Sequence, residues 1–566
     1  MASDAARATR TGGQLLVDTL RVNGVDRVFC VPGESYLPVL DALHDARDAI
    51  RLYVCRHEGA AANAAEAYGK LTGRPGVCLV TRGPGATHGS VGVHTAQQDS
   101  TPLVLLVGQV ARGMAEREAF QELDVRRVFA SMAKWAAQID DADRIPELVT
   151  RAFQTAISGR PGPVVLALPE DMLSEATTAA APAQAARPVR AHPGAEDLAA
   201  LRGMLAQAQR PLVLLGGSGW NAEACARLAR FAAANDLPVA CAYRFQDLFD
   251  NRDERYAGDV GLGVNPRLAQ RIQDADLLLV LGPRLGEITT SGYKLLSVPR
   301  PKQRLVHVHQ GADELGRVYQ PDLAIVSGMP ELAAGLASLA AVAERPWGAW
   351  TRAAGADHAD WVARVPVPGR LQMWDVMDAL ERRLPEDAIV TNGAGNYTLW
   401  LHRFHRYARF RTQVAPTSGA MGYGVPAAIA AKAVHPDRVV VSWNGDGCFL
   451  MYGQELATAV QYGLGVVFIV VNNGMYGTIR MHQERRYPGR VVGTELRNPD
   501  FAAFARAFGA QGEVVEETSQ FAPALERALA AKGPSLIELR VDPEAITPST
   551  TISAIREKSR PEKARA

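Results

Sequence analysis

Residues 445–473 read GDGCFLMYGQELATAVQYGLGVVFIVVNN, and this stretch indicates both the fold and the kind of site. An acidic residue, Asp446, stands in a Gly-Asp-Gly turn, a helical stretch and an apolar strand follow, and the run closes on Asn472-Asn473. Asp446 and Asn473 are 27 positions apart. That spacing suits a fold that brings one carboxylate and one amide oxygen to the same Mg²⁺, a cation that prefers oxygen ligands and bridges phosphates. The glycines would let backbone N–H groups, and the N-terminus of the helix after them, approach a phosphate.

Short apolar runs of this kind recur along the chain, with helical patterns between them. Continuous Val/Ile/Leu runs, rather than alternation, are typical of parallel strands covered on both faces. The sequence therefore predicts an α/β protein with three doubly wound parallel-sheet domains. The predicted strands are 25–31, 76–81, 102–108 and 162–169, then 211–217, 274–282 and 303–309, then 388–393, 438–443, 465–473 and 535–541.

Two stretches look like linkers between these domains. Residues 174–196 are rich in Ala and Pro, and residues 343–370 are interrupted by Pro and Gly. The expected domains are 1–175, 195–342 and 368–550. Ligands of doubly wound sheets bind at the carboxyl ends of strands. Asp446 and Asn473 each follow a strand of the third domain, so we expect them at one sheet edge.

Composition excludes several classes of function. The chain has 566 residues, 47% hydrophobic and 21% charged, with a net charge of +1. This balance gives no reason to expect nucleic acid or an anionic membrane as a partner. No apolar run reaches the roughly 20 residues that span a bilayer, and the N-terminus has no apolar signal segment. Six scattered cysteines fit buried, reduced thiols, so we expect a cytoplasmic protein.

The spacing from Gly-Asp-Gly to Asn-Asn resembles the thiamine-diphosphate-binding motif of the superfamily that includes pyruvate oxidase and acetolactate synthase. The resemblance extends over nearly the whole chain, with motifs in the order of the family. It implies a pyrimidine-binding first domain, a Rossmann-like middle domain and a pyrophosphate-binding third domain. The segments that carry it are 28–58, 77–110 (VCLVTRGPGATHGSVGVHTAQQDSTPLVLLVGQV), 117–124, 162–172, 418–431 (SGAMGYGVPAAIAA) and 497–510 (RNPDFAAFARAFGA).

The resemblance assigns the metal and the diphosphate to the third domain. Asp446 and Asn473 would bind Mg²⁺ by their side chains and Met475 by its backbone carbonyl. Amides around Gly447 and Cys448 would hold diphosphate oxygens. The other positions that match cofactor-binding residues of the family are Gly395, Asn396, Gly445 and Tyr476.

The same resemblance assigns the chemistry to three further residues. Glu58 matches the glutamate that hydrogen-bonds the pyrimidine N1′ and favours the imino tautomer, whose N4′ takes the proton from C2. Met421 matches the apolar residue that holds the cofactor in its bent shape, and the Gly419 carbonyl would accept from the 4′-amino group. Bending places N4′ beside C2, so proximity supplies much of the rate.

One position favours carboligation over simple decarboxylation. Pyruvate decarboxylases place a proton-donating glutamate six positions after the metal-binding asparagine, and here that position is Ile479. The resemblance therefore implies a transferase that decarboxylates a 2-keto acid and adds the resulting enamine to a second carbonyl. Phe120 and Gln121 match residues lining the substrate channel of acetolactate synthases, and Lys134 lies in a comparable region.

Departures from the family leave the substrates open. Glu34-Ser35 changes the polarity of a loop close to the reacting carbon, and Arg480–Gln483 alters the acceptor pocket. The first alternative is therefore a 2-keto-acid decarboxylase, aldehyde lyase or diketone hydrolase on the same cofactor. His57, His88 and His94 are expected to be structural.

Two further expectations concern the middle domain and assembly. Residues 216–219 (GGSG), 282–293 and 306–316 match nucleotide-binding positions, which leaves FAD and an emptied or ADP-type site as alternatives. Since Glu58 and the metal loop come from different subunits in this family, a homodimer or homotetramer is implied. The second alternative is a non-catalytic protein that binds a flavin or a nucleotide. The presence of Glu58, Asp446 and Asn473 argues against this alternative.

Overall fold

The computed structural model describes residues 9–559, so part of the N-terminal segment discussed above lies outside the described residues. The chain forms two compact units, residues 1–189 with 429–434, and residues 190–428 with 435–566. Three six-stranded sheets, each parallel throughout, carry the fold. The predicted fold class is therefore confirmed, whereas the domain limits stay predictions. No helix within residues 9–559 is long and apolar enough to cross a membrane.

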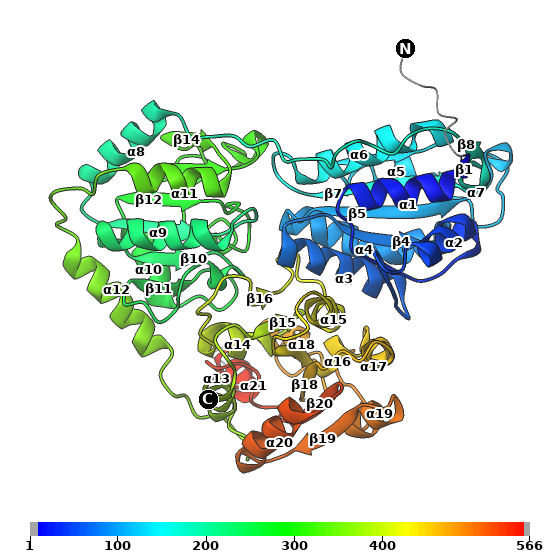
Figure 1. Cartoon of the computed structure of the whole chain (residues 1–566). Coiled ribbons are helices and arrows are strands. Elements are labelled where there is room, and N and C mark those ends of the chain that lie inside the picture. The colour runs from blue at the N-terminus through cyan, green and yellow to red at the C-terminus, as the bar shows by residue number, and fades with distance from the viewer. Residues whose placement is uncertain (1–8, 560–566) are drawn as a thin grey trace. The chain divides into compact units, whose positions relative to one another are not determined.

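The first unit holds one of these sheets, with strand order β3-β2-β4-β5-β7-β6 (Figure 1). A short antiparallel pair, β1 (Arg10–Thr11) and β8 (Ala176–Thr177), joins the two ends of this segment. The sheet strands are β2 (Arg27–Cys30), β3 (Arg51–Val54), β4 (Gly76–Val80), β5 (Leu103–Gln109), β6 (Trp135–Gln138) and β7 (Pro163–Pro169). The helices are α1 (Gly12–Val22), α2 (Leu37–Asp45), α3 (Glu58–Thr72), α4 (Gly83–Asp99), α5 (Val125–Phe129), α6 (Ile145–Ile157) and α7 (Glu170–Ser174).

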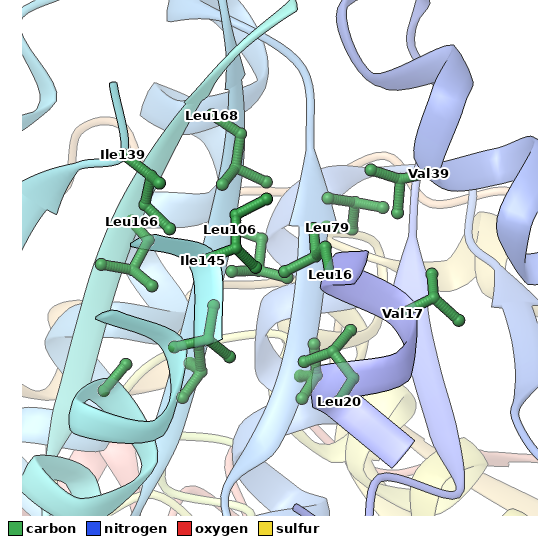
Figure 2. Close-up of a cluster of buried hydrophobic side chains, with 14 of the residues drawn as sticks. Leu16, Val17, Leu20, Val39, Leu79, Leu106, Ile139, Ile145, Leu166 and Leu168 are labelled. Atoms are coloured by element: carbon green, nitrogen blue, oxygen red, sulfur yellow. The ribbon is translucent and has the colours of Figure 1, made fainter. Parts of the chain in front are cut away.

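Amphipathic helices cover one face of this sheet. The buried residues of α6 recur at helical spacing, from Ile145 through Val149 to Phe153, so one stripe faces the strands. Figure 2 shows side chains of α1, such as Leu16, meeting strand residues such as Leu106. Helix α1 starts at a capping box in which Thr11 and Gln14 satisfy each other's backbone N–H groups.

The second unit begins with the middle sheet, in the order β11-β10-β9-β12-β13-β14. Its strands are β9 (Pro211–Leu215), β10 (Val239–Cys241), β11 (Tyr256–Asp259), β12 (Leu277–Leu281), β13 (Arg304–His309) and β14 (Leu323–Val326). The helices are α8 (Ala195–Ala206), α9 (Ala222–Ala234), α10 (Pro266–Asp274), α11 (Met329–Ser338) and α12 (Gly348–Trp361). Helix α12 lies inside the stretch expected to be a linker, because Trp347 at its start is buried in the core of this sheet.

The third sheet belongs to the same unit and has the order β16-β15-β17-β18-β20-β19. Its strands are β15 (Ile389–Asn392), β16 (Gln413–Val414), β17 (Val440–Gly445), β18 (Val467–Asn472), β19 (Gln511–Val515) and β20 (Ser535–Arg540). The helices are α13 (Met373–Arg383), α14 (Thr398–Phe404), α15 (Gly424–Val434), α16 (Asp446–Phe449), α17 (Leu456–Gln461), α18 (Gly477–Arg486), α19 (Phe501–Ala507), α20 (Thr518–Ala530) and α21 (Ile552–Ser559).

All eleven predicted strands are present, and the strands that the sequence did not predict are mostly at sheet edges. The edge strands are β3, β6, β11, β14, β16 and β19, and β10 is the only interior strand that was missed among the described residues. Several edge strands are only partly buried, as in β6 and β14. Without burial on both faces they lack the continuous apolar run that predicts an interior strand.

Candidate active site

A cavity of about 250 Å³ lies at the carboxyl edge of the third sheet. Strands β15, β17 and β18 are parallel neighbours, so their carboxyl ends meet at one edge. The loops that follow these strands line the cavity. Twelve residues predicted from the sequence lie along it: Gly395, Asn396, Gly419, Met421, Gly445, Asp446, Gly447, Cys448, Asn473, Met475, Tyr476 and Ile479.

Asp446 is the one carboxylate among the residues that line this cavity. It is 3% exposed, and burial raises its pKa while hydrogen bonds to the carboxylate oppose that rise. Oδ1 accepts from Gly447 N at 2.9 Å. Oδ2 accepts from Gly474 N at 2.9 Å and from Asn498 Nδ2 at 2.8 Å. Three N–H donors from three segments therefore fix the orientation of this carboxylate.

The loop after β18 supplies the other two predicted metal ligands. Asn473 Oδ1 accepts from Met475 N at 3.2 Å, which closes a tight turn between the two residues. Tyr476 N donates to Thr494 O, and Leu496 N donates to Gly474 O, both at 2.8 Å. Residues 494–496 thus hold the loop against the sheet, and the oxygen donors keep fixed positions at the cavity wall.

Asn498, which the sequence did not predict as a site residue, connects the segments that carry Asp446 and Asn472. Its Nδ2 donates to Asp446 Oδ2 and, at 2.9 Å, to Asn472 Oδ1. Asn472 in turn donates to Glu538 Oε1 at 2.8 Å, so its amide is used inside the sheet edge. Of the paired asparagines, Asn473 is the one that lines the cavity. Asn498 lies in the RNPDF motif, and its position before α19 was the signal available.

The glycines beside Asp446 make room for aromatic rings. A Cβ on Gly445 would lie 2.6 Å from Tyr397, and one on Gly447 would lie 2.6 Å from Tyr476. The N–H of Gly447 already donates to Asp446, and α16 has only four residues. Ring packing therefore accounts for glycine at both positions, and the diphosphate contacts of the amides around Gly447 and Cys448 stay a prediction.

Cys448 joins three segments of the cavity wall. Its Sγ accepts from Gly422 N and from the Tyr397 hydroxyl, both at 3.0 Å. Burial raises the pKa of the Cys448 thiol, so it stays protonated at neutral pH. The structure therefore gives Cys448 a packing role, as expected of a buried thiol.

Two loops complete the cavity wall on the side of β15. Gly419 has φ +72, and a Cβ there would meet no other atom within 4 Å, so the chain leaves open space at this point. Asn396 and Thr478 pair reciprocally: Asn396 N donates to Thr478 Oγ1 at 3.0 Å, and that hydroxyl donates to Asn396 Oδ1 at 2.9 Å. This pair ties the loop after β15 to α18, where Ile479 lies.

A buried arginine of the middle domain holds the same two loops from behind. Arg244 is 4% exposed and has φ +66, in the left-handed region that few residues other than glycine adopt. Its Nη2 donates to Gly393 O at 2.6 Å, and its Nη1 donates to Pro416 O. Gly393 and Pro416 directly precede the cavity residues around 394–396 and 419–421, so one guanidinium fixes both.

Helix α18, which carries Ile479, is fixed at its far end by ion pairs. Arg480 and Arg556 bind the buried Glu484 at 3.0 and 2.7 Å. The hydrogen bonds from Arg556 are the largest cause that lowers the pKa of Glu484 to about 2. Arg556 lies on α21, which packs against α18. Ile479 itself is 54% exposed at the cavity.

Glu58 lies in the first unit and is the first residue of α3. Its Oε2 lies 2.9 Å from His88 Nδ1 of α4. The rings of His57 and His88 stack with centroids 4.7 Å apart. Sequence spacing does not predict this contact between Glu58 and His88.

The residues matched to the substrate channel lie on the same unit. Phe120 is 72% exposed, and the backbone carbonyl of Gln121 accepts from Gly83 N at 2.9 Å. Glu34 is exposed and lies 3.7 Å from the Arg82 guanidinium, which binds Glu170 at 2.6 Å. Ser35, by contrast, is buried and hydrogen-bonds Thr81.

Lys134 has a different setting from those residues. Its Nζ donates to Thr155 O at 2.5 Å and to Ser158 O at 2.6 Å, and both carbonyls lie at the C-terminal end of α6. These two contacts give the ammonium a structural use.

Family models match all three parts of the chain. The N-terminal TPP-binding domain of thiamine pyrophosphate enzymes matches residues 10–128, the central domain 198–336 and the C-terminal TPP-binding domain 393–539. The chain belongs to the thiamine pyrophosphate enzymes.

Relatives of this thiamine pyrophosphate enzyme bear one kind of name. It is 33% identical over 556 residues to an acetolactate synthase large subunit of Parasynechococcus marenigrum, covering 95% of this chain and 88% of the relative. It is 31% identical to the isozyme 2 large subunit of Escherichia coli, covering 94% and 95%. It is 31% identical to the large subunit of Corynebacterium glutamicum, covering 93% and 85%.

The oxygen atoms at the cavity of this thiamine pyrophosphate enzyme fit the binding of Mg²⁺ together with the cofactor. Within residues 9–559 no group of three or more His, Cys, Asp or Glu side chains could hold a metal. The carboxylate of Asp446, the amide oxygen of Asn473 and the carbonyl of Met475 would fill only part of the coordination shell of a cation. Mg²⁺ commonly binds with few protein ligands, and phosphate oxygens complete its shell. The open space at Gly419 lies on the same cavity.

The middle domain of this enzyme brings its predicted nucleotide segments together. The turns after β9, β12 and β13 adjoin, because these strands are neighbours in the sheet. Gln310 Nε2 donates to Ser218 O at 2.7 Å, and a Cβ on Gly219 would lie 2.2 Å from that amide. Gln310 therefore covers the glycine turn that matched a dinucleotide-binding loop.

Proposed function

We propose that this protein is a thiamine-diphosphate- and Mg²⁺-dependent carboligase that joins the fragment left by decarboxylation of a 2-keto acid to a second carbonyl compound. Acetolactate formation from two pyruvates is the reference reaction, since relatives at 31–33% identity are named for it. The observation that carries the choice is Ile479, an aliphatic residue on the cavity wall where a decarboxylase needs a proton donor.

The residues of the chain would divide the work between binding and proton control. Asp446, Asn473 and the Met475 carbonyl would hold Mg²⁺, and through it the diphosphate. Glu58 would hold the proton shared with N1′ of the pyrimidine. When bound, thiamine diphosphate supplies a carbon nucleophile for attack on carbonyl groups.

Residues around the cavity would then orient the cofactor and keep water away. The Gly419 carbonyl would accept from the 4′-amino group, and Met421 would support the bent shape. Because Glu58 belongs to the first domain, the proposal includes a homodimer or homotetramer with active sites between subunits. Phe120, Gln121 and Glu34 would face the substrates.

Product analysis with pyruvate tests the reaction. The holoenzyme, supplied with thiamine diphosphate and Mg²⁺, is expected to form acetolactate. Acetaldehyde as the sole product would contradict carboligation and support the decarboxylase alternative. A panel of 2-keto acids and aldehydes, with products identified by mass spectrometry, then defines the donor and the acceptor.

The nucleotide of the middle domain is a separate proposal. Because Gln310 covers the glycine turn, we propose an emptied or ADP-type site over bound FAD. Visible flavin absorbance in the purified protein would contradict this, and release of ADP or of no nucleotide on denaturation would support it.

A further inference from the structure

The contact between Glu58 and His88 points to a role for the histidine that deepens the proposed function. We propose that His88 is the positioning residue of Glu58: its Nδ1–H holds Oε2 of the carboxylate and leaves Oε1 for the proton shared with the pyrimidine. The proposal rests on the role of Glu58 under the proposed function.

The geometry gives each oxygen of Glu58 a separate task. Oε2 lies 2.9 Å from His88 Nδ1, and an ionised carboxylate can only accept, so the proton of this hydrogen bond is on Nδ1. The Glu58 side chain is 14% exposed and starts α3, whose backbone fixes its Cα. With Oε2 held from α4, rotation of the carboxyl group is blocked and Oε1 keeps one direction.

His57 stays neutral and gives His88 a ring to stack on. His57 Nδ1 accepts from Gly59 N at 2.9 Å and so caps α3, a bond that a proton on Nδ1 would break. Burial, followed by the nearby His88, lowers the pKa of His57. His57 is therefore fixed by the helix cap and offers His88 a rigid ring to stack on.

Other titratable groups near Glu58 do not change charge at neutral pH. Tyr36, from the turn after β2, and Cys78 of β4 interact with Glu58, and burial raises the pKa of both. They are thus uncharged near neutral pH, as is His57. Among these neighbours, His88 is the one whose ring nitrogen lies within hydrogen-bond distance of the Glu58 carboxylate.

The first test reads the tautomer of His88 without cofactor or substrate. Ring ¹⁵N chemical shifts of the full-length protein distinguish Nδ1–H from Nε2–H. The proposal predicts Nδ1–H in the wild type and a shift toward the Nε2–H form in Glu58→Ala. Nε2–H in both proteins would overturn it, because the carboxylate would then hold no His88 proton.

The second test reads activation of the cofactor. Exchange of the C2 proton of bound thiamine diphosphate is followed by NMR at neutral pH. His88→Ala is expected to slow exchange by at least about 10-fold, within the roughly 10²-fold that a misplaced catalytic group costs. His88→Asn keeps an amide donor and is expected to recover most of the rate.

A matched control and the affinity for cofactor separate the outcomes. His94 lies on the same helix, is exposed, and its change to Asn should leave the exchange rate as in the wild type. Cofactor affinity, from thermal shifts, should stay within about threefold in every His88 variant. If Glu58→Gln slows exchange and His88→Ala does not, the His88 proposal alone fails; if Glu58→Gln changes nothing, the proposed function of Glu58 fails.

Discussion

Asp446 of the third domain, a predicted metal ligand, and Glu58 of the first domain differ in how firmly hydrogen bonds hold their carboxylates. Asp446 is buried and receives three hydrogen bonds from separate segments. Glu58 receives one, from a half-exposed histidine. Fixed donors suit a site that only binds, whereas a carboxyl group that shares a proton needs one free oxygen. Binding and activation should therefore respond differently to substitution.

Asp446→Asn should give the largest effect on binding. Loss of the only cavity carboxylate is expected to weaken Mg²⁺-dependent cofactor binding by more than about 100-fold, beyond the 10- to 100-fold that outer partners of metal ligands cost. Titration of thiamine diphosphate at several Mg²⁺ concentrations measures it. Asp437→Asn, an exposed change in the turn before β17, is the control. Equal affinities for wild type and Asp446→Asn would disprove the metal role.

Asn498→Ala should give the next largest effect. It removes one donor to Asp446 Oδ2 and one donor to Asn472 Oδ1, and Gly474 N still donates to both oxygens. Every predicted ligand stays in place. We expect Mg²⁺ affinity to fall by about 10-fold, at the low end for such partners. The rate of C2 proton exchange per bound cofactor should be unchanged. A slower exchange at saturating cofactor would contradict the separation of cofactor binding from cofactor activation.

Arg244→Met tests whether the middle domain supports the cavity. Gly393 O and Pro416 O would each lose the guanidinium donor and keep one other, from Asn392 Nδ2 and Gly419 N. A hydrogen bond from a charged group contributes about 1.5–3 kcal/mol. We expect a lower melting temperature and weaker cofactor binding together. Arg230→Met, on the exposed face of α9, should change neither. An unchanged melting temperature for Arg244→Met would show that the loops after Gly393 and Pro416 keep their conformation without this arginine.

Ile479→Glu should have the smallest effect on folding and the most specific one on products. Because Ile479 is more than half exposed, its replacement should alter stability by no more than about 0.5 kcal/mol. A carboxyl group at this position should divert part of the product from acetolactate to aldehyde. Ile479→Leu serves as the matched control, and an unchanged product ratio in Ile479→Glu would remove the main argument for carboligation.

Sequence patterns predicted the parts of the molecule that depend on local chemistry. Continuous apolar runs identified every interior strand except β10, and the ends of β17 and β18 placed Asp446 and Asn473 on one sheet edge. Edge strands such as β6 and β14 were not predicted, because a partly buried strand does not have a continuous apolar run. The role of Arg244 could not be predicted, because it donates to a backbone carbonyl 172 positions away. Such a long-range contact leaves no local sequence pattern.

The candidate site shows the same limit. Asn498 binds Asp446 across 52 positions, and His88 meets Glu58 across 30, so neither pairing follows from spacing. Ile479, by contrast, could be placed because it lies six positions after Asn473, a predicted metal ligand. The resemblance to a family supplied ligands and the glutamate, whereas the partners that orient them came only from the fold.

The rate of C2 proton exchange in bound thiamine diphosphate, compared between wild type and Glu58→Gln, tests the central claim most directly. We predict that the variant binds cofactor and Mg²⁺ with nearly wild-type affinity while exchange slows by roughly 10²- to 10⁴-fold, the range for general acid–base groups. Equal exchange rates at saturating cofactor would contradict the assignment of activation to Glu58 and of binding to the metal loop.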